Sequence, residues 1–144
     1  MGNIVIESHK GSSLAESEML RDKIRILLDG HRNFERDEDF TIVARDSEDN
    51  LFLGGLIGRV HWGWLYVSHL WVSPESRKQL LGLQLIKYAE NFAREKKLLG
   101  VHLDAFSDFE ALEFYKKLGY VEFGRLPSLK PSTHCIFLKK EFSS

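Results

Sequence analysis

The segment Arg77-Lys-Gln-Leu-Leu-Gly82 is placed where a chain can bind an anion, between a run of apolar residues and the start of a long amphipathic pattern. Backbone N–H groups at the N-terminus of a helix lack intrahelical partners, and the helix dipole makes that end positive. A pyrophosphate group would fit there, and Lys78 would add a point charge. Every strand-to-helix turn offers some free N–H groups, so a purely structural turn is the alternative that this segment alone leaves open.

Side chains that can move a proton occur on several predicted strands. His69, His102 and Asp104 lie on the two strands that precede and follow the longest helix pattern, while His61 and His134 lie on other strands. Each could take a proton from a bound amine, directly or through water, and His69 is the candidate base that we favour. Histidines on separate strands would also be compatible with a metal, but no short ligand spacing accompanies them. We therefore expect no metal site.

Periodicity in the sequence predicts the elements that must position these groups. In the first part of the chain, residues 3–7 alternate as a short strand, and Ser13 with Glu16 forms a capping-box pattern that opens a helix ending at Gly30. Residues 31–39 are polar and predict a loop or a short second helix. Their acidic side chains could attract a cationic amine, although such a run is more often a solvated loop.

The middle of the chain has the pattern of a sheet interrupted by one helix. Residues 40–44 and 51–61 predict a β-hairpin, and residues 65–72 are apolar on both sides, as in a central strand. Residues 77–97 carry the longest amphipathic helix pattern, and residues 101–106 predict another strand. A strand, a long helix and a strand in succession indicate parallel pairing through a right-handed crossover.

The last part of the chain predicts one more helix and a strand pair. Ser107 and Glu110 form a second capping-box pattern, which opens a helix over residues 111–118. Residues 120–124 and 134–142 then have strand character. The complete order of elements predicts a mixed sheet with helices on its faces.

Two segments together carry a resemblance to a known family. Leu70-Trp-Val-Ser-Pro-Glu-Ser-Arg-Lys-Gln-Leu-Leu-Gly-Leu-Gln-Leu85 and Ala111-Leu-Glu-Phe-Tyr-Lys-Lys-Leu-Gly-Tyr120 resemble the signature segments of the GNAT N-acetyltransferases. That family writes them as Val-x-Pro-x-x-Arg-x-x-Gly-x-Gly and Ala-x-x-Phe-Tyr-x-x-x-Gly-Phe/Tyr. The matching residues are Val72, Pro74, Arg77 and Gly82 in the first segment, and Ala111, Phe114, Tyr115, Gly119 and Tyr120 in the second. The element order also resembles that of the family over nearly the whole chain.

The resemblance implies a fold and a cofactor site. The fold would be α/β (α+β), with a mixed, mostly antiparallel central sheet, a splayed parallel strand pair and helices on both faces. The pantetheine arm of acetyl-CoA would enter between strands 65–72 and 101–106 and pair with the backbone of the first. The residues that this resemblance assigns to the cofactor are Leu70, Trp71, Val72, Arg77, Lys78, Gln79, Leu80, Leu81, Gly82, Leu83, Asp108 and Tyr115.

The chemistry that the resemblance implies is direct attack of a neutral amine on the thioester within a ternary complex. The backbone N–H of Val72 would stabilise the tetrahedral oxyanion. Tyr115 matches the family's general acid and would protonate the leaving thiolate, since a phenol of pKa about 10 lies near a thiol of pKa about 8.5. The alternative for Tyr115 is a core aromatic residue on the helix stripe.

Three positions depart from the family's pattern. Leu80 stands at the first glycine of the pyrophosphate loop, where its side chain could crowd the approach of phosphate. Lys78 replaces a frequent glycine, and Asp108 replaces a frequent asparagine and has the character of a helix N-cap.

Acetylation of a small-molecule amine is the function we expect. The alternatives are acetylation of a protein lysine or N-terminus, and a non-catalytic acyl-CoA-binding module, which Leu80 favours.

Length and composition exclude several other classes. The chain has 144 residues, 43% hydrophobic and 28% charged, which is typical of one globular domain, here 1–144. With a net charge of -1, the chain has no excess of basic residues of the kind that nucleic-acid-binding proteins carry. No apolar run has the length of a signal peptide or a membrane span, so we expect a cytoplasmic protein without a membrane partner. The single Cys135 is expected to be a reduced strand residue.

Features outside these motifs suggest the acceptor region and a partner. Trp62 and Trp64, on either side of Gly63, could stack on a ligand or cover the core. Together with the proline-bearing loop 126–133, they also suggest a homodimer, and the resemblance supports this because the family pairs through edge strands.

Overall fold

The structure is a computed structural model that describes residues 2–29, 37–77 and 80–143. The chain divides into two compact units, with the boundary between residues 35 and 36. The first unit contains the helix α1 (Ala15–Leu28), as the sequence predicts. The predicted helix end at Gly30 and most of the predicted loop 31–39 lie outside the described residues.

Two details of the first unit differ from prediction. The strand predicted at residues 3–7 is wrong, because these residues have no regular structure and no strand to pair with inside their own unit. The capping box at Ser13 and Glu16 is also wrong, since α1 begins after Leu14 and has no side-chain hydrogen bond at its cap. Taken by itself, the unit leaves every residue of α1 at least partly exposed.

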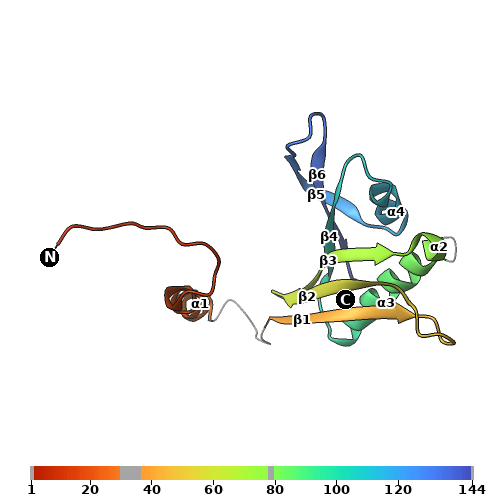
Figure 1. The fold of residues 1–144 in the computed structure, drawn as a ribbon, viewed down its shortest axis with the longest axis horizontal. Coiled ribbons are helices and arrows are strands. Elements are labelled where there is room, and N and C mark those ends of the chain that lie inside the picture. The colour runs from red at the N-terminus through yellow and green to blue at the C-terminus, as the bar shows by residue number, and fades with distance from the viewer. Residues whose placement is uncertain (1, 30–36, 78–79, 144) are drawn as a thin grey trace. The chain divides into compact units, whose positions relative to one another are not determined.

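The second unit is built on a six-stranded sheet with the order β1-β2-β3-β4-β6-β5. Neighbouring strands are antiparallel except β3 and β4, which are parallel. This confirms the predicted mixed sheet and the predicted hairpin, which is β1 with β2 (Figure 1). The strands are β1 (Glu38–Arg45), β2 (Phe52–His61), β3 (Trp64–Val72), β4 (Gly100–Phe106), β5 (Val121–Pro127) and β6 (His134–Glu141).

The connection between β3 and β4 contains two helices where the sequence predicts one over residues 77–97. These are α2 (Pro74–Arg77) and α3 (Leu81–Glu95). α3 confirms the predicted long helix, but it begins at Leu81 rather than at residue 77, because Leu80 adopts a left-handed backbone, with φ of 60° and ψ of 27°. The last helix, α4 (Ala111–Lys117), begins after Glu110 with no side-chain cap. Neither the Ser107–Glu110 capping box nor an Asp108 cap is formed.

The core lies between one face of the sheet and the helices α3 and α4. Buried side chains of α3 and α4 join the same cluster as buried side chains of β3, β4 and β6. The members with 2% exposure or less include Leu65, Ile86, Leu103, Leu138 and Tyr120. Within residues 37–143, the described helices thus cover one face, and the opposite face carries the alternate, more polar side chains of each strand.

A buried carboxylate in this core is fully partnered. Glu90 of α3 is 5% exposed, accepts a hydrogen bond from the Tyr120 hydroxyl at 2.8 Å and lies 3.2 Å from the Lys140 ammonium. Burial and the Glu90 charge raise the pKa of Tyr120, which therefore stays protonated and donates. In this core a buried charge is accompanied by an opposite charge and a donor.

Candidate functional site

The two parallel strands separate partway along their length, as predicted. They pair from Trp64 with Gly100 to Val67 with Leu103 and no further, although β3 continues to Val72 and β4 continues to Phe106. Beyond this point the backbone of β3 that faces β4 has no strand partner on that side among the described residues. The result is an opening between the strands with main-chain donors and acceptors along its β3 wall.

A bulge in β3 lies at the position where the strands separate. Across the antiparallel pair, Ile57 lies opposite His69 and Gly58 lies opposite Val67, which leaves Ser68 as an extra residue. A bulge of this kind bends its strand and increases the local twist. A Cβ at Gly58, beside the bulge, would lie 2.6 Å from the Phe40 ring, so a larger residue there would require that ring to shift.

The loop predicted to bind pyrophosphate lies at the far end of the same wall. Val72 ends β3, and its carbonyl accepts a hydrogen bond from Arg77 Nε at 3.1 Å, which ties α2 to the strand. α3 begins at Leu81, and its first N–H groups form a helix N-terminus. Lys78 and Gln79 lie outside the described residues.

The two signature segments meet at this helix N-terminus. A Cβ built on Gly82 would lie 3.7 Å from the Phe114 ring and 3.9 Å from Val72 Cγ2, so β3, α3 and α4 come together there. These are ordinary contact distances, so packing within the chain does not require glycine at position 82. The side chain of Leu80 is 65% exposed, and it stands beside the helix start rather than in the core.

Tyr115 is buried on α4 behind this junction. It is 6% exposed, with Phe114 stacked at 5.3 Å and Tyr120 edge-on at 5.9 Å between ring centroids. Burial, and next the negative charge of Asp104, raise the pKa of Tyr115 to about 12. The phenol therefore remains protonated at neutral pH, in the form that can donate a hydrogen bond or a proton.

Asp104 is the first residue of β4 beyond the parallel pairing. Its Oδ2 accepts a hydrogen bond from the Tyr66 hydroxyl at 2.7 Å, across the parallel strands. Burial, followed by this contact, raises the pKa of Tyr66 to about 12. His102 stacks on Tyr66 at 4.8 Å, and burial lowers the pKa of His102, which favours the neutral imidazole. Burial and the Asp104 charge raise the pKa of the Cys135 thiol.

Among the other predicted proton acceptors, His61 is close enough to His102 to contribute to its lowered pKa. His69 is exposed, with Nδ1 2.8 Å from the neighbouring Ser68 Oγ. His61 Nδ1 is 2.8 Å from Asp37 Oδ2, and His134 follows the loop between β5 and β6. The assignment of His69 as a base therefore stays a prediction, and sequence reasoning missed Tyr66, which carries no motif signal.

Asp108 forms an ion pair instead of a helix cap. Its Oδ2 lies 2.6 Å from Lys130 Nζ, and this contact holds the pKa of the carboxyl below its usual range. Ser107 Oγ accepts the backbone N–H of His134 at 2.9 Å. Ser107 and Asp108, each predicted to cap α4, thus connect the start of that helix to the segment between β5 and β6. The assignment of Asp108 to the cofactor stays a prediction.

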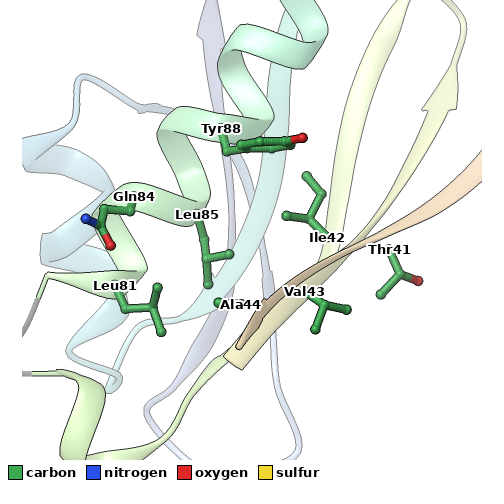
Figure 2. Close-up of a pocket in the computed structure, with 8 residues that line it drawn as sticks. All are labelled: Thr41, Ile42, Val43, Ala44, Leu81, Gln84, Leu85 and Tyr88. Atoms are coloured by element: carbon green, nitrogen blue, oxygen red, sulfur yellow. The ribbon is translucent and has the colours of Figure 1, made fainter. Parts of the chain in front are cut away.

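A separate pocket of about 370 Å³ lies at the sheet edge, between β1 and the first turns of α3 (Figure 2). Its apolar wall includes Ile42, Leu81 and Leu85, and Tyr88 lies at its upper side. No residue of β3 or β4 lines it, and no carboxylate or imidazole does. The pocket is therefore distinct from the opening between the strands, and its lining offers no acid or base for acyl transfer.

Among the described residues, no group of three or more histidine, cysteine, aspartate or glutamate side chains could hold a metal ion. In the same part of the chain, no helix is long and apolar enough to cross a membrane.

Comparison with known proteins defines the class of this chain. Residues 7–120 match the acetyltransferase (GNAT) family, and the chain belongs to that family. It is 34% identical over 104 residues to acetyltransferase Atu2258 of Agrobacterium fabrum, covering 72% of this chain and 74% of that protein. It is 39% identical over 89 residues to the blasticidin-S acetyltransferase of Streptomyces morookaense, covering 61% of this chain and 65% of that protein. The chain is thus an acyltransferase of the GNAT class.

Solved structures share the fold. A crystal structure described as an acetyltransferase from Agrobacterium tumefaciens superposes with a TM-score of 0.76 and 30% identity, covering 98% of this chain and 100% of that one. A chain described as a streptothricin acetyltransferase from Bacillus anthracis was solved with acetyl coenzyme A. It has a TM-score of 0.63 and 20% identity, and the match covers 78% of this chain and 67% of that chain. This chain therefore shares the fold of a neighbour that was solved with acetyl coenzyme A.

Proposed function

We propose that this chain transfers the acetyl group of acetyl-CoA to the primary amine of a small molecule, within a ternary complex. The observation that carries the proposal is the opening between β3 and β4, with a helix N-terminus at one end and the buried phenol of Tyr115 nearby. The similarity to a blasticidin-S acetyltransferase supports a small-molecule acceptor.

The opening offers acetyl-CoA two kinds of contact. Its pantetheine amides would pair with the unpaired backbone of residues 68–72, in the manner of an added strand. Its pyrophosphate would lie over residues 77–83, where the N–H groups of the α3 start and the side chain of Lys78 carry positive charge. The thioester would then lie toward the point where the strands separate.

The reaction needs one proton to move from nitrogen to sulfur. The neutral amine attacks the thioester carbon, a C–N bond forms, and the Val72 N–H would stabilise the oxyanion. The C–S bond then breaks, and the thiolate accepts a hydrogen bond and a proton from Tyr115. A proton from the amine then reprotonates the Tyr115 hydroxyl. Because a phenol of pKa about 12 is a weaker acid than a thiol of pKa about 8.5, hydrogen-bond donation to the developing thiolate is its main contribution.

Leu80 is the position on which the alternative of a non-catalytic acyl-CoA-binding module depends. Its left-handed backbone, with φ of 60°, is a conformation that glycine adopts freely. The loop therefore keeps a glycine-like path despite the substitution, and this supports cofactor binding. The exposed side chain of Leu80 would have to lie beside the phosphates.

Thiol release from acetyl-CoA tests the proposal. The assay would use a panel of aminonucleosides, polyamines, amino acids and a lysine peptide, together with calorimetric titration of CoA. Turnover with a small amine is the expected result. CoA binding without turnover would identify an acyl-CoA-binding module, and turnover with the peptide alone would identify a protein acetyltransferase.

A further inference from the structure

Asp104 differs from Glu90, the buried acid of this unit, in the charge of its partner. Its Oδ2 is bound by the neutral Tyr66 hydroxyl, and no lysine or arginine forms an ion pair with it in the described part of the chain. Glu90, by contrast, has Lys140 beside it. A partly buried carboxylate that has no cation beside it among the described residues offers a binding position for one.

The groups around Asp104 are neutral and leave it available. Tyr66, Tyr115 and Cys135 have raised pKa values and stay protonated, while His102 has a lowered pKa and stays uncharged near neutral pH. On β6, Phe137 lies opposite Asp104. The nearby Lys139 is 3.1 Å from Glu141, whose charge it partners.

The position of Asp104 matches the place where the acceptor must enter. It follows Leu103, the last residue of β4 that pairs with β3, so it stands at the narrow end of the opening. Its side chain lies on the sheet face opposite the buried Leu103 and Ala105, away from α3. An acceptor could therefore approach from that face while acetyl-CoA occupies the opening.

We propose that the Asp104 carboxylate, held by Tyr66, binds the ammonium form of the acceptor's reacting amine and selects cationic amines as substrates. This inference rests on the acetyltransferase function proposed above. The ammonium passes one proton to the carboxylate, directly or through water, and the resulting neutral amine attacks the thioester. The second amine proton replaces the one taken by the thiolate, and Asp104 returns its proton to solvent. The balanced reaction converts an ammonium and acetyl-CoA into an acetamide, CoA thiol and one proton.

The main effect of Asp104 is on binding of the acceptor. A carboxyl group is a much stronger acid than an alkylammonium, so the shared proton lies almost entirely on the nitrogen and the resting complex contains the ion pair. Charged hydrogen bonds of this kind contribute about 1.5–3 kcal/mol, equivalent to a change in KM of about 10- to 150-fold.

The test compares Asp104→Asn with the wild type on two acceptors that share one skeleton, an alkylamine and the matching hydrazide, which is uncharged at neutral pH. Asparagine keeps the shape and can still accept the Tyr66 hydrogen bond. KM for the amine should rise about 10- to 150-fold, while KM for the hydrazide and the affinity for CoA change less than about threefold. Glu122→Gln, an exposed acid on β5 that pairs with Arg125, should change neither KM.

Each other outcome has a distinct meaning. An equal loss with both acceptors would show a structural role and overturn the inference, as would an unchanged KM for the amine. If Asp104→Asn does not fold, the wild type alone decides, because equal KM values for amine and hydrazide would also overturn it. Absence of wild-type turnover with every acceptor would instead refute the proposed function.

Discussion

The Leu80→Gly variant should be more stable to unfolding than the Leu80→Ala variant. This order is the reverse of the usual one at helix positions. The φ of 60° and ψ of 27° of Leu80 place an L-residue in the left-handed region, at a cost of about 1–2 kcal/mol. Alanine keeps that cost, whereas glycine removes it and adds about 0.5–1 kcal/mol of lost chain entropy. Both substitutions lose the same partial contacts of a side chain that is 65% exposed.

The difference between these two variants isolates the backbone effect. Leu80→Gly should exceed Leu80→Ala by about 0.5–1 kcal/mol in the free energy of unfolding, or a few degrees in Tm. The control pair is Gln84→Gly and Gln84→Ala, on the exposed side of α3. There the alanine variant should have the larger free energy of unfolding, by about 1 kcal/mol. Denaturant titration measures all four. A preference for alanine at position 80 as large as that at position 84 would refute the left-handed assignment.

Three further predictions concern the site. Gly82→Glu should weaken CoA binding more than 100-fold by charge and clash at the helix start, as measured by calorimetry, and unchanged affinity would remove the pyrophosphate from this loop. Tyr115→Phe should lower kcat by about 10- to 150-fold, the contribution of a hydrogen bond to a charged group, with little change in CoA affinity or Tm, and wild-type turnover would show that Tyr115 has only a packing role. Burial of His102 favours its neutral form, so its stabilising contribution is present above pH about 6.5 and is lost as the pH falls further. His102→Gln should therefore flatten the dependence of stability on pH below about 6.5, and an unaltered profile from urea titrations would contradict that.

The homodimer suggested by the sequence stays a prediction. Trp62 is 64% exposed, and β1 and β5 are the edge strands of the six-stranded sheet in the described part of the chain. Light scattering at high protein concentration would test it, and a mass near 16.7 kDa would count against it.

The elements that depend on local periodicity were predictable. α3 has a clear amphipathic pattern, β3 is a largely apolar run of strand length, and β4 alternates apolar and polar residues. The parallel pairing followed from the length of the crossover. Tyr115 was found because it lies in a signature segment, although the sequence alone does not show that it is buried or that its pKa is raised.

The features that depend on register were not predictable. The extra residue Ser68 exists only in relation to Ile57 and Gly58 on the neighbouring strand. The Tyr66–Asp104 contact likewise joins residues 38 positions apart through the parallel pairing. The left-handed conformation of Leu80 had only an indirect signal, the glycine of the family pattern at this position, because leucine itself rarely adopts it. The strand predicted at residues 3–7 failed because alternation alone does not provide a pairing partner.

A crystal structure with acetyl-CoA tests the central claim most directly, namely that the opening between β3 and β4 is the acetyl-transfer site. The pantetheine arm should pair with the backbone of residues 68–72, the pyrophosphate should lie at the start of α3, and the sulfur should lie within hydrogen-bond reach of the Tyr115 hydroxyl. Acetyl-CoA bound in the pocket between β1 and α3, with the strand opening empty, would contradict the claim.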